Sequence, residues 1–175
     1  MKASVYIGTS LDGYIARKNG DIDWLVQFAN EEAIDAYHEF MKNIDVILIG
    51  RGTYEKVLSF PSWPYNKKVF VASTSLKELS NTLKNKASIV SGTLSQILQQ
   101  LSQEGFSSVY VDGGKLIQSF LNEDLIDELI ISKVPILIGT GLPLFGDLNM
   151  DLPFTHLRTT VQKNQLVRSY YTRKR

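Results

Sequence analysis

Residues 109–121 read Val109-Tyr110-Val111-Asp112-Gly113-Gly114-Lys115-Leu116-Ile117-Gln118-Ser119-Phe120-Leu121. The apolar residues before Asp112 predict a buried strand, and the apolar positions after the glycines share one stripe, which predicts a helix with a core-facing side. The Gly-Gly pair leaves backbone N–H groups free at the helix N-terminus, where the helix dipole favours an anion. A tight strand-to-helix turn without a ligand would have the same sequence. The rest of the chain must therefore distinguish an anion-binding turn from a purely structural one.

The composition limits the possible functions. The chain has 175 residues, of which 43% are hydrophobic, and this suits a single domain over residues 1–175. The 19 basic and 18 acidic residues nearly cancel, so neither nucleic acid nor a membrane is expected as a partner, although residues 173–175 are locally basic. With no cysteine and only His38 and His156, which we interpret as structural, we expect no metal site. No segment indicates secretion or membrane insertion, so we expect a cytoplasmic protein.

A second strand-glycine-helix pattern lies earlier in the chain. The apolar residues 45–49 predict a strand, and Gly50-Arg51-Gly52-Thr53 begins the following helix. The Arg51 guanidinium and the Thr53 hydroxyl would then lie beside free N–H groups, which is the combination that a phosphate uses. A capped helix with Arg51 in solvent is the alternative.

A third strand, expected over residues 67–72, ends in Ser73-Thr74-Ser75. Its hydroxyls could hold a phosphate or cap the following turn. Ligands of open α/β sheets bind where the carboxyl ends of strands meet helix N-termini. The strand ends at Gly50, Ser73 and Gly113 therefore predict a site that a dinucleotide could span, although neither GxGxxG nor GxxxxGK[ST] is present.

The remaining elements indicate an α/β order with an antiparallel end, and hence a mixed sheet covered by helices. Residues 9–24 have too little periodicity for a helix, so we expect a long lid or binding loop with Trp24 as its apolar anchor. Pro135 predicts that the strand within residues 125–138 bends or leaves the sheet there. The other expected elements are a strand over 3–8, a helix from Asn30 to about Asn43, a strand over 88–90, a helix over 93–104, and strands over 157–161 and 166–172 joined by a polar turn at Lys163-Asn164.

Four motifs in this order resemble the dihydrofolate reductase-like fold, and especially the reductase domain of the bifunctional riboflavin-biosynthesis deaminase-reductases. The motifs are Ser10-Leu11-Asp12-Gly13, the segment from Gly50 to Glu55, Val111-Asp112-Gly113-Gly114, and the segment from Pro135 to Phe145. The resemblance implies a three-layer sandwich with a mixed, mostly parallel central sheet, flanking helices and an antiparallel C-terminal hairpin. The H-x-E and P-C-x-x-C motifs of the zinc deaminase half are absent, so we interpret the chain as a stand-alone reductase module.

The same resemblance implies NADPH as the cofactor. Matching positions at the phosphates are Gly50, Arg51 and Thr53, with Ser73 and Thr74 near the adenosine 2′-phosphate and Gly113, Gly114, Lys115 and Leu116 at the pyrophosphate. Matching positions at the nicotinamide are Ile7, Gly8, Ile15 and Ala16. The implied activity is hydride transfer to a small heterocycle of the pterin, folate or riboflavin-pathway pyrimidine type. An NADP(H)-binding module without efficient turnover, acting as a sensor or scaffold, is the alternative.

The substrate side is predicted less completely. Dihydrofolate reductases carry an acid early in the first helix, but the matching residue, Asp35, falls on the outer side of the helical wheel. Riboflavin-type reductases have an acid before the Gly-Gly pair, so Asp112 is the candidate for orienting substrate or relaying a proton, with a turn-capping role as the alternative. Asp12, Trp24 and Ser132 are further candidates for substrate contact. Relatives are usually homodimers, and residues 142–145 could supply the contact.

Overall fold

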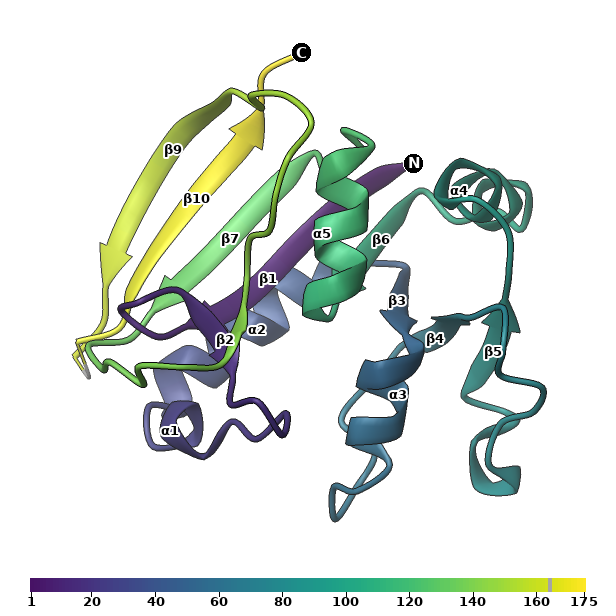
Figure 1. Cartoon of the computed structure of the whole chain (residues 1–175), viewed down its shortest axis with the longest axis horizontal. Helices are drawn as coiled ribbons and strands as arrows, with labels where there is room; N and C mark the ends of the chain where they lie inside the picture. The colour runs from purple at the N-terminus through teal and green to yellow at the C-terminus, as the bar shows by residue number, and fades with distance from the viewer. Residues whose placement is uncertain (164) are drawn as a thin grey trace.

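A mixed eight-stranded sheet forms the centre of the computed structural model, which describes residues 1–163 and 165–175 (Figure 1). The strand order is β5-β4-β3-β6-β1-β7-β10-β9. The first six strands in this order run parallel, and β10 is antiparallel to both of its neighbours. The bounds are β1 (Lys2–Thr9), β3 (Val46–Gly50), β4 (Lys68–Ala72), β5 (Ala87–Val90), β6 (Ser108–Asp112), β7 (Glu128–Lys133), β9 (Phe154–Val161) and β10 (Val167–Arg173).

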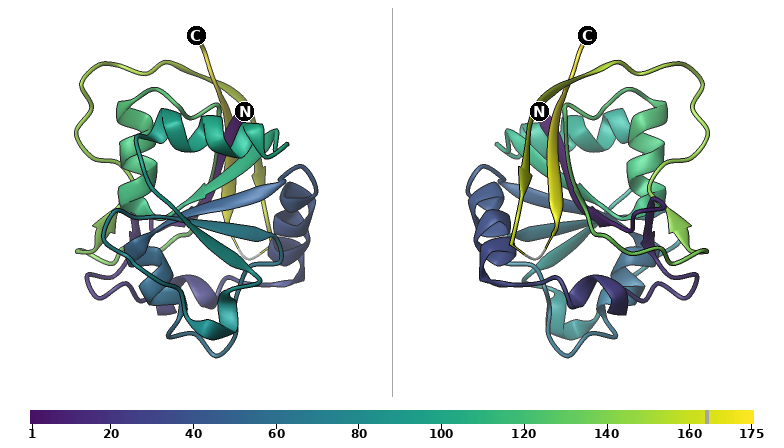
Figure 2. Two further views of the ribbon diagram at one scale, coloured as in Figure 1. Left: turned by 90° about the vertical axis from the view of Figure 1, so that its right-hand side faces the viewer. Right: turned by 90° about the vertical axis from the view of Figure 1, so that its left-hand side faces the viewer.

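Helices cover both faces of the sheet, as the side views in Figure 2 show for α5 on one face and α2 on the other. Side-chain oxygens cap two of them: Asn30 accepts from the Ala33 N–H at α2, and Thr93 accepts from the Gln96 N–H at α4. The helices are α1 (Asp23–Val26), α2 (Glu31–Lys42), α3 (Arg51–Val57), the 3-10 helix η1 (Asn81–Leu83), α4 (Leu94–Gln103) and α5 (Gly114–Asn122). None of the helices in the described ranges is long and apolar enough to cross a membrane.

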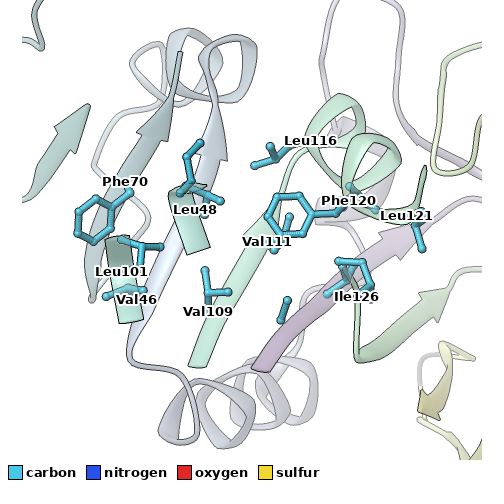
Figure 3. Packing of buried hydrophobic residues seen from close by; sticks show 14 of the residues in the cluster. Val46, Leu48, Phe70, Leu101, Val109, Val111, Leu116, Phe120, Leu121 and Ile126 are labelled. Atoms are coloured by element: carbon cyan, nitrogen blue, oxygen red, sulfur yellow. The ribbon is translucent and has the colours of Figure 1, made fainter. Parts of the chain in front are cut away.

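The larger hydrophobic core lies between the sheet and the helices α4 and α5. Alternate residues of the central strands, such as Val46 and Leu48 of β3 and Val109 and Val111 of β6, belong to this core, with Leu101 of α4 beside Val46 and Phe120 of α5 beside Val111 (Figure 3). Because helices cover both faces, Val46–Ile49 are buried without a break, as expected for a parallel strand. This packing fixes the carboxyl ends of β3 and β6 side by side.

The second core lies on the opposite face, under α2. Phe40 and Met41 of α2 pack there against buried residues of β3, β4 and β6. Tyrosines are frequent in this layer, and Tyr6, Tyr37, Tyr65, Tyr110 and Tyr170 all belong to it. This face therefore carries more hydroxyl groups than the core under α4 and α5.

The structure confirms the predicted α/β order and the antiparallel end, and β7 ends at Lys133, shortly before Pro135. Part of the interpretation of residues 9–24 as an irregular loop was wrong. That stretch contains β2 (Tyr14–Ala16) and Trp24 within α1, and β2 pairs with β8 (Leu142–Pro143). Strands of three and two residues have too few side chains to show alternation. The predicted turn at Lys163-Asn164 includes Asn164, which lies outside the described residues.

Candidate functional site

The two glycine turns meet at the carboxyl ends of β3 and β6, which are neighbours in the sheet. Gly113 has φ +103°, a conformation that favours glycine, and a Cβ atom added to it would lie 2.1 Å from Oγ1 of Thr53. Thr53 belongs to the first turn of α3, so this contact joins the predicted phosphate-binding segments. A side chain at residue 113 would fill the space beside both helix starts.

A pocket of about 320 Å³ lies at the ends of β3, β4 and β5. The predicted residues Arg51, Ser73 and Thr74 line it, together with Ser75, Ser91 and Gly92. Arg51 Nη1 donates to Ser75 Oγ at 2.9 Å, and Ser73 Oγ accepts from the Leu76 N–H at 3.0 Å. The Ser73 hydroxyl thus caps its turn, and it also borders an open pocket that contains a guanidinium.

Of the predicted nicotinamide-side residues, Ile15 lies next to one of these turns. Ile15 Cδ1 would be 2.7 Å from a Cβ atom added to Gly114, so β2 lies against the start of α5. At the end of β1, a Cβ atom added to Gly8 would be 2.7 Å from Leu25 of α1. Ile7 packs against the larger core, and Ala16 is buried.

The remaining two predicted cofactor residues differ in exposure. Lys115 is exposed, whereas the side chain of Leu116 is 8% exposed and belongs to the larger core. Leu116 can therefore offer a ligand only its backbone N–H.

Asp112 lies at the end of β6 on the face covered by α2, because it is two residues after Tyr110 of the second core. Oδ2 of Asp112 accepts a hydrogen bond from the Tyr65 hydroxyl at 2.7 Å. Burial raises the pKa of the Asp112 carboxyl, and the hydrogen bond from the Tyr65 hydroxyl is the largest effect that opposes this shift. A carboxyl group with a raised pKa beside a strand-end glycine turn is a good candidate for proton transfer.

Tyrosine hydroxyls surround this carboxyl group. Burial, followed by the nearby Asp112 charge, raises the pKa of Tyr37 to about 12 and also raises the pKa of Tyr65. The Tyr110 hydroxyl donates to the backbone carbonyl of Tyr6 at 3.0 Å. These hydroxyls therefore stay protonated near neutral pH.

The three further substrate candidates lie in different environments. Asp12 accepts from the Ser10 hydroxyl at 2.6 Å and from the Gly139 N–H at 2.8 Å, so it ties the loop after β1 to the segment before β8. The Ser10 bond is the largest cause of the lowered pKa of Asp12. Trp24 is 2% exposed and packs with Val134, as an apolar anchor does.

Ser132, the third candidate, is buried on β7, and its Oγ accepts from Arg168 Nε at 2.9 Å. Asp35 is exposed, as the helical wheel indicated. Of the two histidines, His156 is exposed and bonds Thr159, and His38 is exposed on α2.

Sequence reasoning missed three residues of this face: Tyr6, Tyr65 and Arg168. Tyr65 follows Trp63-Pro64 in an irregular segment, and no local pattern connects it to Asp112. Tyr6 lies within β1 and Arg168 within β10. An aromatic residue or a single charge in a strand does not by itself indicate a functional site. The spacing of two residues between Arg168 and Tyr170 along β10 could have indicated that these two side chains lie on the same face of the sheet.

The fold defines the class of protein. Dihydrofolate reductase from Enterococcus faecalis, solved as a complex with NADP(H), superposes with a TM-score of 0.72 over 99% of this chain and 97% of that chain, at 13% identity. The fold is therefore dihydrofolate reductase-like.

The chain belongs to the RibD C-terminal domain family, whose model matches residues 3–167. A protein from Shewanella sp. PV-4, provisionally named a riboflavin biosynthesis protein, is 44% identical over the full length of both chains, with a TM-score of 0.94. A Thermotoga maritima deaminase and 5-amino-6-(5-phosphoribosylamino)uracil reductase superposes over 99% of this chain and 56% of its own, at 16% identity and a TM-score of 0.78. The family supports a reductase-type oxidoreductase function.

Proposed function

We propose that the protein is an NADPH-dependent reductase that transfers hydride to a small heterocycle of the pterin, folate or riboflavin-pathway pyrimidine type. The observation that carries this proposal is that the start of α3 serves both places: Arg51 lines the pocket with Ser73, and Thr53, two residues on, lies against Gly113. Together they present a guanidinium, hydroxyls and two helix starts, a set of groups that suits a phosphorylated dinucleotide.

In this proposal the cofactor lies across the ends of β4, β3 and β6. Arg51, Ser73 and Thr74 hold the 2′-phosphate, since a guanidinium offers a bidentate fork to a phosphate. The backbone at Gly50 and Thr53 and at residues 113–116 faces the pyrophosphate. Ile7, Gly8, Ile15 and Ala16 border the nicotinamide. NADPH, when bound, supplies the hydride, and the chain supplies orientation and water exclusion.

Asp112 is the proposed group for substrate orientation or proton relay. It lies on the α2-covered face, beside the strand ends that border the nicotinamide position, and Tyr65 holds one of its oxygens. The raised pKa of the carboxyl favours proton exchange nearer neutral pH than an exposed aspartate allows. Asp12 and Trp24 shape the loop that borders this face, through the contacts with residues 134–139.

Parallel titrations with NADPH and NADH, followed by intrinsic fluorescence, test the proposal. We expect saturable NADPH binding and a much weaker response to NADH, because only NADPH carries the 2′-phosphate that faces Arg51. The absence of binding at millimolar NADPH would rule the proposal out.

A binding module without turnover is the second candidate, since α2 lacks an inward acid. Its four acidic residues, Glu31, Glu32, Asp35 and Glu39, are all exposed. NADPH binding without NADPH oxidation across pterin, folate and pyrimidine substrates would favour it. Oxidation with any of these substrates would favour the reductase.

We also propose a homodimer. Four apolar side chains in β8 and the segment after it are exposed, at Leu142, Phe145, Leu148 and Met150. Such a cluster suits an interface with a second copy. Light scattering on wild type and on Phe145→Asp tests this: a dimer that becomes a monomer supports it, and a wild-type monomer at micromolar concentration contradicts it.

A further inference from the structure

Glu55 lies one turn after Arg51 on α3, so the two side chains share one side of the helix. Arg51 Nε and Glu55 Oε1 are 3.5 Å apart. Arg51 lines the pocket of about 320 Å³ at the ends of β3, β4 and β5, and among the described residues that line this pocket it is the only charged one. The ion pair therefore brings a carboxylate to the one cation that the pocket offers.

Ser75 is the stronger of the two partners that hold the Arg51 side chain. Nη1 of Arg51 donates to Ser75 Oγ at 2.9 Å, and Ser75 itself lines the pocket. The ion pair with Glu55 is longer, and the two side chains are 53% and 58% exposed, so water and salt screen it. The cation also precedes the acid, which is the weaker order for a pair four residues apart. Removal of the Glu55 charge should therefore leave the guanidinium beside Ser75.

A 2′-phosphate bound to Arg51 would lie close to this carboxylate. A phosphate monoester carries a charge of about −1.5 to −2 at pH 7. The guanidinium has five N–H donors, so it can bind the phosphate while Nη1 stays with Ser75. Phosphate and carboxylate would then share one guanidinium, and like charges this close repel each other even in water.

We infer that Glu55 is a specificity-determining residue, which opposes the 2′-phosphate and holds the preference for NADPH over NADH below the level that Arg51 and the pocket hydroxyls would otherwise give. The inference rests on the proposed function, because it concerns the cofactor proposed for this pocket. NADP⁺ carries the same 2′-phosphate, so the carboxylate also weakens the oxidised cofactor and favours its release. NADH has a hydroxyl at that position and should not sense the charge.

Calorimetric titration of the full chain with NADPH and with NADH at neutral pH tests the inference. Glu55→Gln should bind NADPH about three- to tenfold more tightly, because the repulsion from one partly screened charge is removed, and should bind NADH as wild type does. Glu55→Lys should gain at least about tenfold, since the repulsion becomes an attraction. Both gains should shrink as the salt concentration rises from about 0.05 M to about 0.5 M.

Two adenosine phosphates separate the pocket from the rest of the cofactor. Adenosine 2′,5′-bisphosphate and adenosine 5′-monophosphate differ only in the 2′-phosphate. Glu55→Gln should improve the affinity for the bisphosphate by the same factor as for NADPH and leave the monophosphate unchanged.

Glu104 provides the matched control. It is the C-cap of α4 and pairs with Lys68 at 3.6 Å. Leu94, which lines the pocket, begins the same helix, so Glu104 lies about 15 Å further along the helix axis. Glu104→Gln and Glu104→Lys make the same charge changes and should leave the ratio of NADPH to NADH affinity unchanged.

An affinity of Glu55→Gln for NADPH that is equal to or weaker than that of wild type, or an equal gain for NADH, would overturn the inference. Saturable NADPH binding by wild type would leave the proposed function standing in that case. Tighter bisphosphate binding by Glu55→Gln, without NADPH oxidation by wild type in the presence of any pterin, folate or pyrimidine substrate, would instead refute the proposed reductase and support the inference. Failure of both wild type and Glu55→Lys to bind the bisphosphate would overturn both.

Discussion

The Tyr65 hydroxyl donates a 2.7 Å hydrogen bond to Oδ2 of Asp112. It reaches β6 from the irregular segment before β4, where its ring packs edge-on against Trp63 with 5.3 Å between centres. The bond stabilises the charged carboxylate and opposes the effect of burial on the Asp112 pKa. Burial is the larger effect, so the Asp112 pKa stays raised, and the Tyr65 bond limits how far it rises.

Tyr65→Phe should raise the pKa of Asp112, since it removes a hydrogen bond to the charged form and leaves burial in place. The Asp112 limb in the pH dependence of NADPH oxidation should move to higher pH. Tyr171→Phe, on the other face of the sheet, should not move it. An unchanged limb in Tyr65→Phe would refute this role for Tyr65.

Asp112→Asn should spare NADPH affinity and lower turnover by about 10²- to 10⁴-fold, the usual contribution of a positioned acid or base. Cofactor titration and steady-state oxidation measured on the same sample check both parts. Full turnover in the variant would assign Asp112 to turn capping.

Arg51→Ala should weaken NADPH by about tenfold or more and NADH far less, because a charge-assisted bond to the 2′-phosphate is lost only for NADPH. Arg158→Ala, an exposed arginine of β9, is the control. Equal losses for the two cofactors would refute contact between Arg51 and the 2′-phosphate.

Gly113→Ala should lower stability by about 2 kcal/mol, because an L side chain at positive φ is strained. The new Cβ would also meet Thr53. Gly52→Ala, whose added Cβ meets nothing within 4 Å, should instead raise stability by about 0.5–1 kcal/mol, since alanine favours a helix interior. Chemical denaturation compares the two, and equal effects would contradict the geometry at Gly113.

Asp45 should make the fold sensitive to acid. Its carboxylate accepts from the Ser107 N–H and hydroxyl, both at 2.8 Å, and these bonds lower its pKa to about 2. The folded-state pKa lies below the unfolded value, so this stabilisation is full above about pH 4 and is lost as the pH falls toward 2. The stability difference between wild type and Asp45→Ala should shrink over that range, and a constant difference would contradict it.

Local sequence patterns were enough to predict where several residues of the candidate site lie in the fold. Gly113, Arg51 and Ser73 each follow an apolar strand, and parallel strands bring their carboxyl ends to one edge of the sheet. The contacts around Asp112 and Ser132 join segments that are distant in the sequence. Tyr65 reaches Asp112 across 47 residues, and Arg168 reaches Ser132 across 36, without a periodic signal for either contact. The pairing of β2 with β8 was missed because both strands are too short to show a pattern.

NADPH binding to the wild-type chain, measured by calorimetry beside NADH, is the most direct test of the central claim. We predict saturable binding of NADPH with at least about tenfold preference over NADH, as expected from one charge-assisted contact to the 2′-phosphate. No heat of binding at millimolar NADPH, or equal affinity for the two cofactors, would contradict the assignment of the strand ends at Arg51, Ser73 and Gly113 to this cofactor.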